Sequence, residues 1–251
     1  MYVADTYNSL VRRINLATGV VTNIGTSASP PWSSPTDAKV DGSGNVFVAD
    51  CNNAKIRRID GVTGDVTNIG TSATYYNPVG LALDRTWSYV YVADTFNNLV
   101  RKINIASGDV INVGTSAANP GWHWPHAVAV DGNNNVFVAD AENNLIRRID
   151  GVTGYVTNIG TSASPAINYP TGITVDLSGS FVYVANYGNN VIQQIELATG
   201  IVNKIGTSVS YTYPKGLDVD SAGNVYEADA GSNQVRMITV SAPTAAPTSR
   251  S

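Results

Sequence analysis

Carboxylates occupy the most regular positions in this chain. One series ends short apolar runs such as Val-Ala-Asp, at intervals of 43 to 46 residues, and consists of Asp5, Asp50, Asp94, Asp140 and Asp229, with Asn186 in one place. A second series consists of Asp41, Asp84, Asp131, Asp176 and Asp220. Asp41-Gly-Ser-Gly-Asn45 loosely resembles a calcium loop, but it lacks a second carboxylate and a bidentate Glu. We therefore interpret both series as turn caps that accept backbone N–H hydrogen bonds, and we predict no metal or other cofactor.

Groups suited to nucleophilic, acid–base or zinc chemistry are few. The chain has two histidines, His123 and His126, and a single cysteine, Cys51. A catalytic zinc site usually has three protein ligands, and no Ser-His-Asp or Cys-His pattern is evident. A single cysteine also excludes an internal disulfide. The sequence therefore favours a protein that is not an enzyme.

The most variable segments carry aromatic residues beside Asn, Ser or Pro. Aromatic rings with a polar tip or edge mark recognition surfaces, and flat rings beside amides and hydroxyls also suit sugars. The alternative is that rings close to proline fold inward as lids over the core. Because Trp122 and Trp124 are difficult to bury together, we predict a binding face. Its candidate residues are Trp32, Tyr75, Tyr76, Trp122, His123, Trp124, Glu142, Tyr169, Tyr211 and Tyr213.

A repeating set of short strands would position these groups. The run Asn-Ile-Gly-Thr-Ser, or a close variant, begins at Asn23, Asn68, Asn112, Asn158 and Lys204. A fixed period of this length is typical of propellers and other repeat arrays. Each repeat has four apolar segments, here named strands a, b, c and d, separated by Gly- and Asn-rich turns. One copy comprises 127–131, 135–140, 145–149 and 155–159.

The number of strands predicts the number of blades. The sequence supplies five a, six b, six c and five d strands, beginning with b and ending with c. We therefore predict an all-β, six-bladed β-propeller over residues 1–240, with incomplete terminal blades. Because successive strands are antiparallel, the d-to-a and b-to-c connections share one face, which holds the candidate site. Residues 241–251 are rich in Ser, Thr, Pro and Ala and are predicted to be a linker or tail.

The repeat resembles that of the NHL-repeat family. The residues that carry the resemblance are Gly80-Leu-Ala-Leu-Asp84, Val90-Tyr-Val-Ala-Asp94, Asn97-Asn-Leu99 and Arg101-Lys102, and the pattern extends from Tyr2 to about Thr239. The histidine in the name-giving tripeptide is replaced by Ser9, Asn98 or Asn144 in a turn. The resemblance implies a β-propeller. Some members bind nucleic acid, and enzymes with similar propellers use several histidines or place Glu and Asn metal ligands at the central channel.

Charge argues against a nucleic-acid partner. The net charge is −4, the pI is about 5.0 and the loops carry few basic residues. Basic pairs instead occur on the c strands, at Arg12-Arg13, Arg57-Arg58, Arg101-Lys102 and Arg147-Arg148. We expect them to lie between blades and to pair with turn carboxylates. Gln193-Gln194 replaces the basic pair in the copy with Asn186, which suggests that a charge pair is replaced as a unit.

These observations predict a non-catalytic binding module for a glycan or a protein. The alternative is a divalent-metal-dependent hydrolase or lyase at the central channel, with Glu142 as a lone candidate ligand. No apolar run is long enough to span a membrane. Because Met1 lies in the middle of a repeat, we expect a monomeric domain of a larger protein. The Ser/Thr/Pro tail favours a secreted or cell-surface parent protein.

Overall fold

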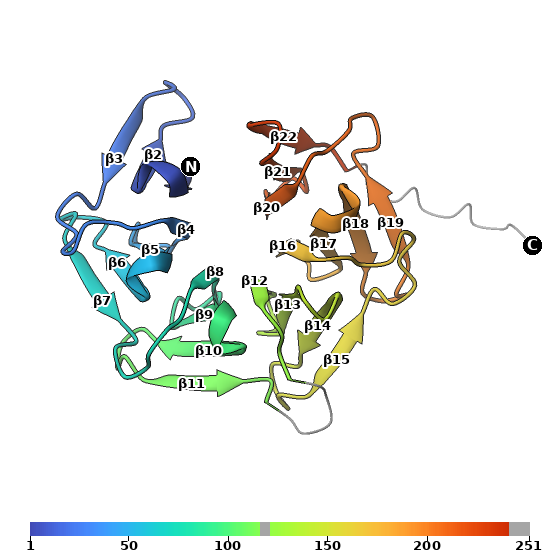
Figure 1. Ribbon diagram of the computed structural model, residues 1–251, viewed down its shortest axis with the longest axis horizontal. Coiled ribbons are helices and arrows are strands. Elements are labelled where there is room, and N and C mark those ends of the chain that lie inside the picture. The colour runs from blue at the N-terminus through green and yellow to red at the C-terminus, as the bar shows by residue number, and fades with distance from the viewer. Residues whose placement is uncertain (116–120, 241–251) are drawn as a thin grey trace, which may run out of the picture.

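The computed structural model describes residues 1–115 and 121–240, so the predicted tail at 241–251 lies outside the described residues. The described part forms six antiparallel sheets arranged in a ring (Figure 1). The prediction of a six-bladed β-propeller is confirmed. Within the described residues, the search for an apolar helix long enough to cross a membrane finds none.

The first three blades contain eleven strands. Blade 1 has β1 (Tyr2–Asp5), β2 (Leu10–Ile14) and β3 (Val21–Ile24). Blade 2 has β4 (Pro35–Val40), β5 (Val46–Asp50), β6 (Lys55–Ile59) and β7 (Val66–Ile69). Blade 3 has β8 (Pro78–Leu83), β9 (Tyr89–Asp94), β10 (Leu99–Asn104) and β11 (Val110–Val113).

The last three blades contain another eleven strands. Blade 4 has β12 (Pro125–Val130), β13 (Val136–Asp140), β14 (Leu145–Ile149) and β15 (Val156–Ile159). Blade 5 has β16 (Pro170–Val175), β17 (Phe181–Asn186), β18 (Val191–Glu196) and β19 (Val202–Ile205). Blade 6 has β20 (Pro214–Val219), β21 (Val225–Asp229) and β22 (Gln234–Ile238).

The terminal blades are the three-stranded ones, as predicted. In the described residues, blade 1 has strands b, c and d, and blade 6 has a, b and c. Figure 1 shows these two blades facing each other across an opening in the ring.

The b strands lie in the core, and the two faces of each b strand in blades 2 to 5 pack against the blades on either side. Val46 and Val48 pack with Val11 of blade 1, whereas Phe47 and Ala49 pack with residues of blade 3. This alternation follows from the two-residue period of a strand. The inner a strands approach one another closely. A Cβ on Gly80 would lie 2.6 Å from the His126 carbonyl oxygen, so only glycine fits there.

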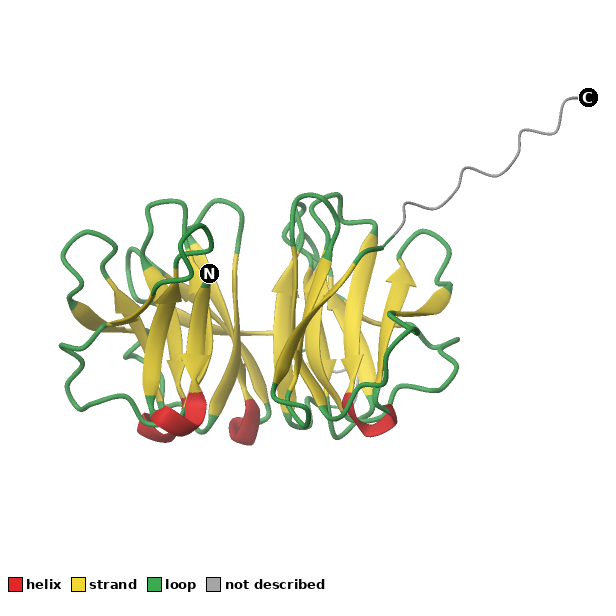
Figure 2. Ribbon diagram, turned by 90° about the horizontal axis from the view of Figure 1, so that it is seen from above, coloured by secondary structure: helices red, strands yellow, loops and turns green. Residues whose placement is uncertain are grey.

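The d-to-a loops and b-to-c turns share one face of the disc, as predicted; we call it the loop face. Four b-to-c turns are short 3₁₀ helices, η1 (Thr6–Asn8), η2 (Cys51–Asn53), η3 (Thr95–Asn97) and η4 (Tyr187–Asn189), and Figure 2 shows all of them on that side. Backbone hydrogen bonds join the two connections, from Phe96 N–H to the Tyr76 carbonyl (3.1 Å) and from Glu142 N–H to the His123 carbonyl (3.1 Å).

Candidate functional site

Each b-strand carboxylate holds the loop face together. In blade 2, Asp50 Oδ1 accepts a hydrogen bond from the Ser33 N–H (2.8 Å), and Oδ2 accepts one from Asn53 Nδ2 (2.8 Å) and pairs with Arg57 (2.8 Å). Equivalent ion pairs join Asp5 to Arg12, Asp94 to Arg101, Asp140 to Arg147 and Asp229 to Arg236. The carboxylates are therefore structural caps, and these five arginines pair with them as predicted.

Blade 5 replaces this ion pair with a neutral pair. Asn186 Oδ1 accepts a hydrogen bond from the Asn168 N–H (2.9 Å), and its Nδ2 donates to Gln193 Oε1 (2.9 Å). Gln193 Nε2 donates in turn to the Pro165 carbonyl (2.8 Å). The two substitutions thus conserve the geometry of the ion pair without its charge, which confirms the prediction that the pair is replaced as a unit.

Four of the ten candidate residues are buried lids. Trp32, Tyr75, Trp122 and Tyr211 are only 7%, 4%, 6% and 6% exposed. Trp32 Nε1 donates to the Gly25 carbonyl (2.9 Å), and Tyr75 donates its hydroxyl hydrogen to the Gly70 carbonyl (3.1 Å). The expectation that these four rings are exposed is wrong, because their polar tips find partners inside the blade.

The lids also cover the buried arginines. The Arg57 guanidinium lies 5.1 Å from the Trp32 ring centre, and Arg147 lies 5.2 Å from that of Trp122. Such stacking uses the planar cation and the aromatic face together. At these positions, the alternative in which rings fold inward over the core is correct.

The remaining aromatic candidates, together with Phe96 and Tyr187, form two runs of ring contacts. Tyr76 contacts Phe96 with 5.2 Å between ring centres, and Phe96 contacts Trp124, also at 5.2 Å. A second run joins Tyr169 to Tyr187 at 5.8 Å and Tyr187 to Tyr213 at 5.1 Å, the last pair being stacked. We call these six rings the aromatic arc: Tyr76, Phe96, Trp124, Tyr169, Tyr187 and Tyr213. It spans blades 3 to 6 on the loop face.

Polar candidates lie beside the arc. The exposed His123 ring is 6.4 Å from the Trp124 ring, and its backbone N–H donates to Asp140 Oδ1 (2.8 Å). Burial raises the pKa of the Tyr169 hydroxyl, and the charge of nearby Glu142 adds to this effect. His126 Nε2 lies 3.5 Å from the same hydroxyl. Burial, aided by the charge of Lys215, lowers the pKa of His126 to about 4, so His126 is neutral at pH 7.

Three rings of the arc stand on strained backbone. Trp124, Tyr169 and Tyr213 have φ values of 51°, 47° and 56°, in the left-handed region that bulky residues rarely adopt. Each directly precedes a proline. The two preceding d-to-a loops have the smaller residues Ser34 and Asn77 at this position, with φ of 50° and 55°. Strain of this kind tends to concentrate at functional sites, so the three aromatic residues are the strongest candidates.

Alignment of the loops on proline separates buried from exposed rings. All four buried lids lie three residues before the proline that begins an a strand, whereas Trp124, Tyr169 and Tyr213 lie one residue before it. The predicted set omitted Phe96 and Tyr187, which lie in b-to-c turns of the same face. The spacing between each d-to-a aromatic residue and the following proline is visible in the sequence, and it could have separated the buried lids from the exposed rings.

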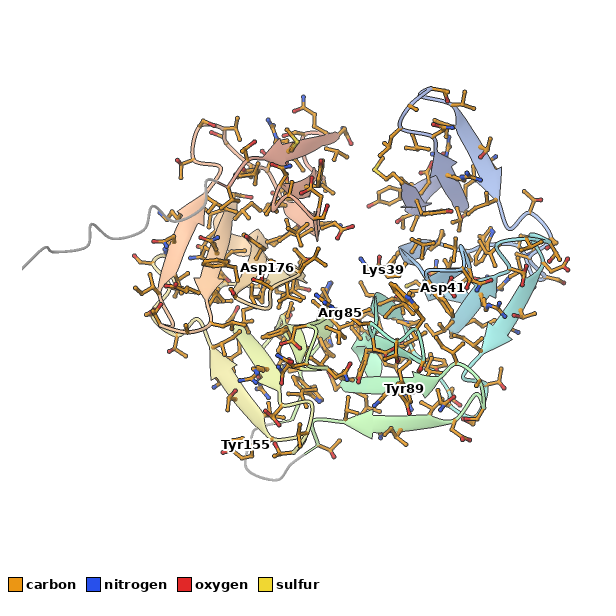
Figure 3. All side chains as sticks on the ribbon, turned by 180° about the vertical axis from the view of Figure 1, so that it is seen from behind. Lys39, Asp41, Arg85, Tyr89, Tyr155 and Asp176 are labelled. Atoms are coloured by element: carbon orange, nitrogen blue, oxygen red, sulfur yellow. The ribbon has the colours of Figure 1, made fainter. Side chains whose placement is uncertain are left out.

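The central channel offers a different environment. A cavity of about 430 Å³ is lined by inner-strand residues that include Lys39, Ala82, Thr174 and Asp218. On the side opposite the loop face, the Arg85 guanidinium donates to the Leu177 carbonyl of blade 5, and Figure 3 shows Arg85 and Lys39 near the ring centre. Neither Glu142 nor either histidine lines this cavity.

The described residues contain few groups of the kind that metal or thiol chemistry uses. Among residues 1–115 and 121–240, no group of three or more His, Cys, Asp or Glu side chains could hold a metal ion. Cys51 is buried beside Asn77, and burial raises the pKa of its thiol, which opposes formation of a reactive thiolate.

Comparisons with known proteins find one repeat family that matches part of the chain and several solved structures with a similar fold. The family model of the NHL repeat matches residues 123–149, which include much of blade 4. A search of curated proteins finds no match. Solved structures similar to this chain include virginiamycin B lyase from Staphylococcus aureus with quinupristin (18% identity, TM-score 0.69, covering 93% of this chain and 75% of that chain). Another is a nidogen/laminin complex (16% identity, TM-score 0.76, covering 94% of this chain and 87% of that chain). A third is an auxiliary nutrient binding protein from Bacteroides ovatus (13% identity, TM-score 0.71, covering 92% of this chain and 64% of that chain).

Proposed function

The chain is an NHL-repeat β-propeller, and on that premise we propose that it is a non-catalytic binding module whose partner, a glycan or a protein segment, contacts the aromatic arc. The observation that carries this proposal is the constrained presentation of Trp124, Tyr169 and Tyr213. Each ring is held on left-handed backbone in direct contact with another ring. Rigid, partly exposed aromatic surface binds partners with little loss of conformational entropy.

Similar propellers are compatible with this role. The nidogen/laminin structure is a protein complex, and the Bacteroides ovatus structure is described as a nutrient binding protein. Because both are under 20% identical to this chain, they support the use of the fold as a binding platform and do not identify a ligand. We further propose that residues 1–240 act as one domain, monomeric and part of a larger secreted or cell-surface protein.

The second candidate function is a divalent-metal-dependent hydrolase or lyase at the central channel. Its support is the similarity to virginiamycin B lyase, which is a similarity of fold. Because Glu142 does not line the channel cavity whereas Asp218 does, metal-dependent turnover that is lost in Asp218→Ala would favour this candidate over the binding module.

Binding should depend on the arc and not on exposed aromatic area in general. We expect the double variant Trp124→Ala/Tyr213→Ala to lose the partners that the wild-type protein binds on glycan and peptide arrays. The matched control is Trp87→Ala. Trp87 is 45% exposed and also has a positive φ (56°), but it lies in an a-to-b turn on the opposite face. It should keep the full binding profile.

Thermal unfolding of each variant would show that the fold is intact. Retention of every array signal by the folded double variant would contradict a binding role for the arc. Loss of the same signals in Trp87→Ala would show that the effect is not specific to the loop face.

A further inference from the structure

The three strained rings belong to three equivalent units, each formed across a blade boundary. The backbone N–H of Trp124 donates to Asn98 Oδ1 of the preceding blade (2.9 Å). In the same way, Tyr169 donates to Asn144 (2.7 Å) and Tyr213 donates to Asn190 (2.8 Å). The ring and the asparagine of each unit therefore lie side by side, at the boundaries between blades 3 and 4, 4 and 5, and 5 and 6.

Each unit has unused hydrogen-bond donors. Asn98, Asn144 and Asn190 are exposed, and among their side-chain atoms only Oδ1 makes a hydrogen bond within residues 1–115 and 121–240. The Nδ2 group of each carries two N–H donors that remain available to a ligand. An aromatic ring and a pair of amide donors are thus presented together three times.

The amide group of the asparagines is not needed for the turn or for blade docking, because Ser9 Oγ accepts the equivalent hydrogen bond from the Ser34 N–H (3.5 Å) and Ala54 has no side-chain acceptor. The equivalent turn positions of blades 1 and 2 are Ser9 and Ala54, whose φ values (54° and 52°) match that of Asn98 (54°). The loops that follow them have Ser34 and Asn77 in place of the aromatic residue, and these blades pack with the same regular sheets. Ring and asparagine therefore occur together where neither is required by the fold.

This combination fits a carbohydrate. The apolar C–H face of a sugar ring can stack on an aromatic ring while its hydroxyl groups accept hydrogen bonds from amide N–H groups. Charged side chains beside the three units are few, chiefly Glu142 and Lys215, and His126 is neutral at pH 7. Three like subsites favour a ligand that repeats one chemical group, whereas the side chains of a peptide change along its length.

We propose that the partner is a neutral oligosaccharide of repeated sugar units that occupies more than one of these three subsites at once. This inference rests on the proposed binding function and specifies its ligand class. Because linked ligand units raise the effective concentration at the next subsite, affinity should increase steeply with chain length. A ligand limited to one subsite would show no such dependence.

The test uses the whole chain and neutral oligosaccharides of one to eight units, namely the β-1,4-linked series of glucose, mannose and N-acetylglucosamine, measured by calorimetry. We expect affinity for one series to rise at least tenfold from disaccharide to hexasaccharide. Asn98→Ser, Asn144→Ser and Asn190→Ser should each lower hexasaccharide affinity about five- to tenfold, and the triple variant should abolish detectable binding. Serine is chosen because Ser9 already occupies this turn.

The matched control is Asn233→Ser. Asn233 occupies the same turn position in blade 6, with φ of 54°, but no described loop follows it to supply a ring. It should bind as the wild type does. Equal affinity for short and long oligosaccharides, unchanged binding by the asparagine variants, or no binding of any series by the folded protein would each overturn the inference.

The same samples separate this inference from the proposed function. If peptides bind, and Trp124→Ala/Tyr213→Ala abolishes that binding, the arc is a binding site and the oligosaccharide inference is wrong. If the double variant binds every partner of the wild type, the proposed function itself fails.

Discussion

Asp50→Asn is expected to lower the free energy of unfolding by about 3–5 kcal/mol, because it leaves the Arg57 charge buried and without its counter-ion. Asp50 and Arg57 are 0% and 1% exposed, and the ion pair measures 2.8 Å. The Asp50 carboxylate also holds the Ser33 N–H of the adjacent loop. Arg57→Gln should be destabilising for the complementary reason, since it leaves a buried carboxylate without its cation.

The double variant Asp50→Asn/Arg57→Gln should recover most of this loss. Blade 5 shows that the neutral pair fits the same site, because Asn186 and Gln193 are both 0% exposed and share a 2.9 Å hydrogen bond. Urea unfolding of the two single variants and the double variant gives the coupling free energy, which we expect to be favourable and larger than about 2 kcal/mol. A double variant as unstable as the sum of the single variants would contradict the idea that the pairs are interchangeable units.

Blade 1 provides the control for burial. Asp5 and Arg12 make the same ion pair at 2.7 Å, but their side chains are 24% and 32% exposed. Because solvent screens an exposed pair, Asp5→Asn should cost no more than about 1 kcal/mol. An equal cost at both sites would mean that burial does not decide the energy of this pair.

The repeat pattern predicted the fold well because its signals are local. Each Gly- and Asn-rich turn and each Val-Ala-Asp run involves only a few neighbouring residues. Counting the strands that these patterns delimit predicted six blades with incomplete ends. The face shared by the d-to-a and b-to-c connections followed from strand direction alone. Substitution of one complete charge pair by a neutral pair was also predictable, because both partners change in the same copy.

The identity of the exposed rings was harder to predict because it depends on tertiary contacts. Trp122 and Trp124 are two residues apart, yet Trp122 donates its indole N–H to the Val113 carbonyl inside the blade while Trp124 contacts Phe96 on the loop face. Composition and exposure tendencies do not distinguish two tryptophans in one loop. The number of residues between each tryptophan and the following proline distinguishes them, because that proline fixes where the a strand begins.

Glu227→Val is expected to stabilise the protein at pH 8, because Glu227 occupies a position where four other blades have a buried valine. Those residues are Val48, Val92, Val138 and Val184, all 0% exposed. Glu227 is also 0% exposed, and neither carboxyl oxygen has a hydrogen-bond partner in the part of the chain that the structure describes. A buried carboxyl group without partners is costly when it is ionised.

The stability difference should depend on pH in a defined direction. Burial, aided by the charge of Asp229 and opposed by Arg236, raises the pKa of Glu227 from 4.5 to about 7. Between these values the native state binds the proton more tightly than the unfolded chain does, so the stability of the wild type falls as the pH rises. Relative to its value at pH 4, the advantage of Glu227→Val should grow through pH 7 and reach about 3 kcal/mol at pH 8.

His126 gives an internal control of opposite sign. Its pKa is lowered from 6.5 to about 4, so its contribution to stability is present above pH 6.5 and is lost as the pH falls toward 4. His126→Thr, chosen because Thr36 and Thr171 occupy the same strand position in blades 2 and 5, should therefore gain stability relative to wild type at low pH and not at pH 8. Urea unfolding of wild type and both variants at pH 4, 6 and 8 measures the two differences. A Glu227→Val difference that does not change with pH would contradict a raised pKa of this carboxyl group in the native state.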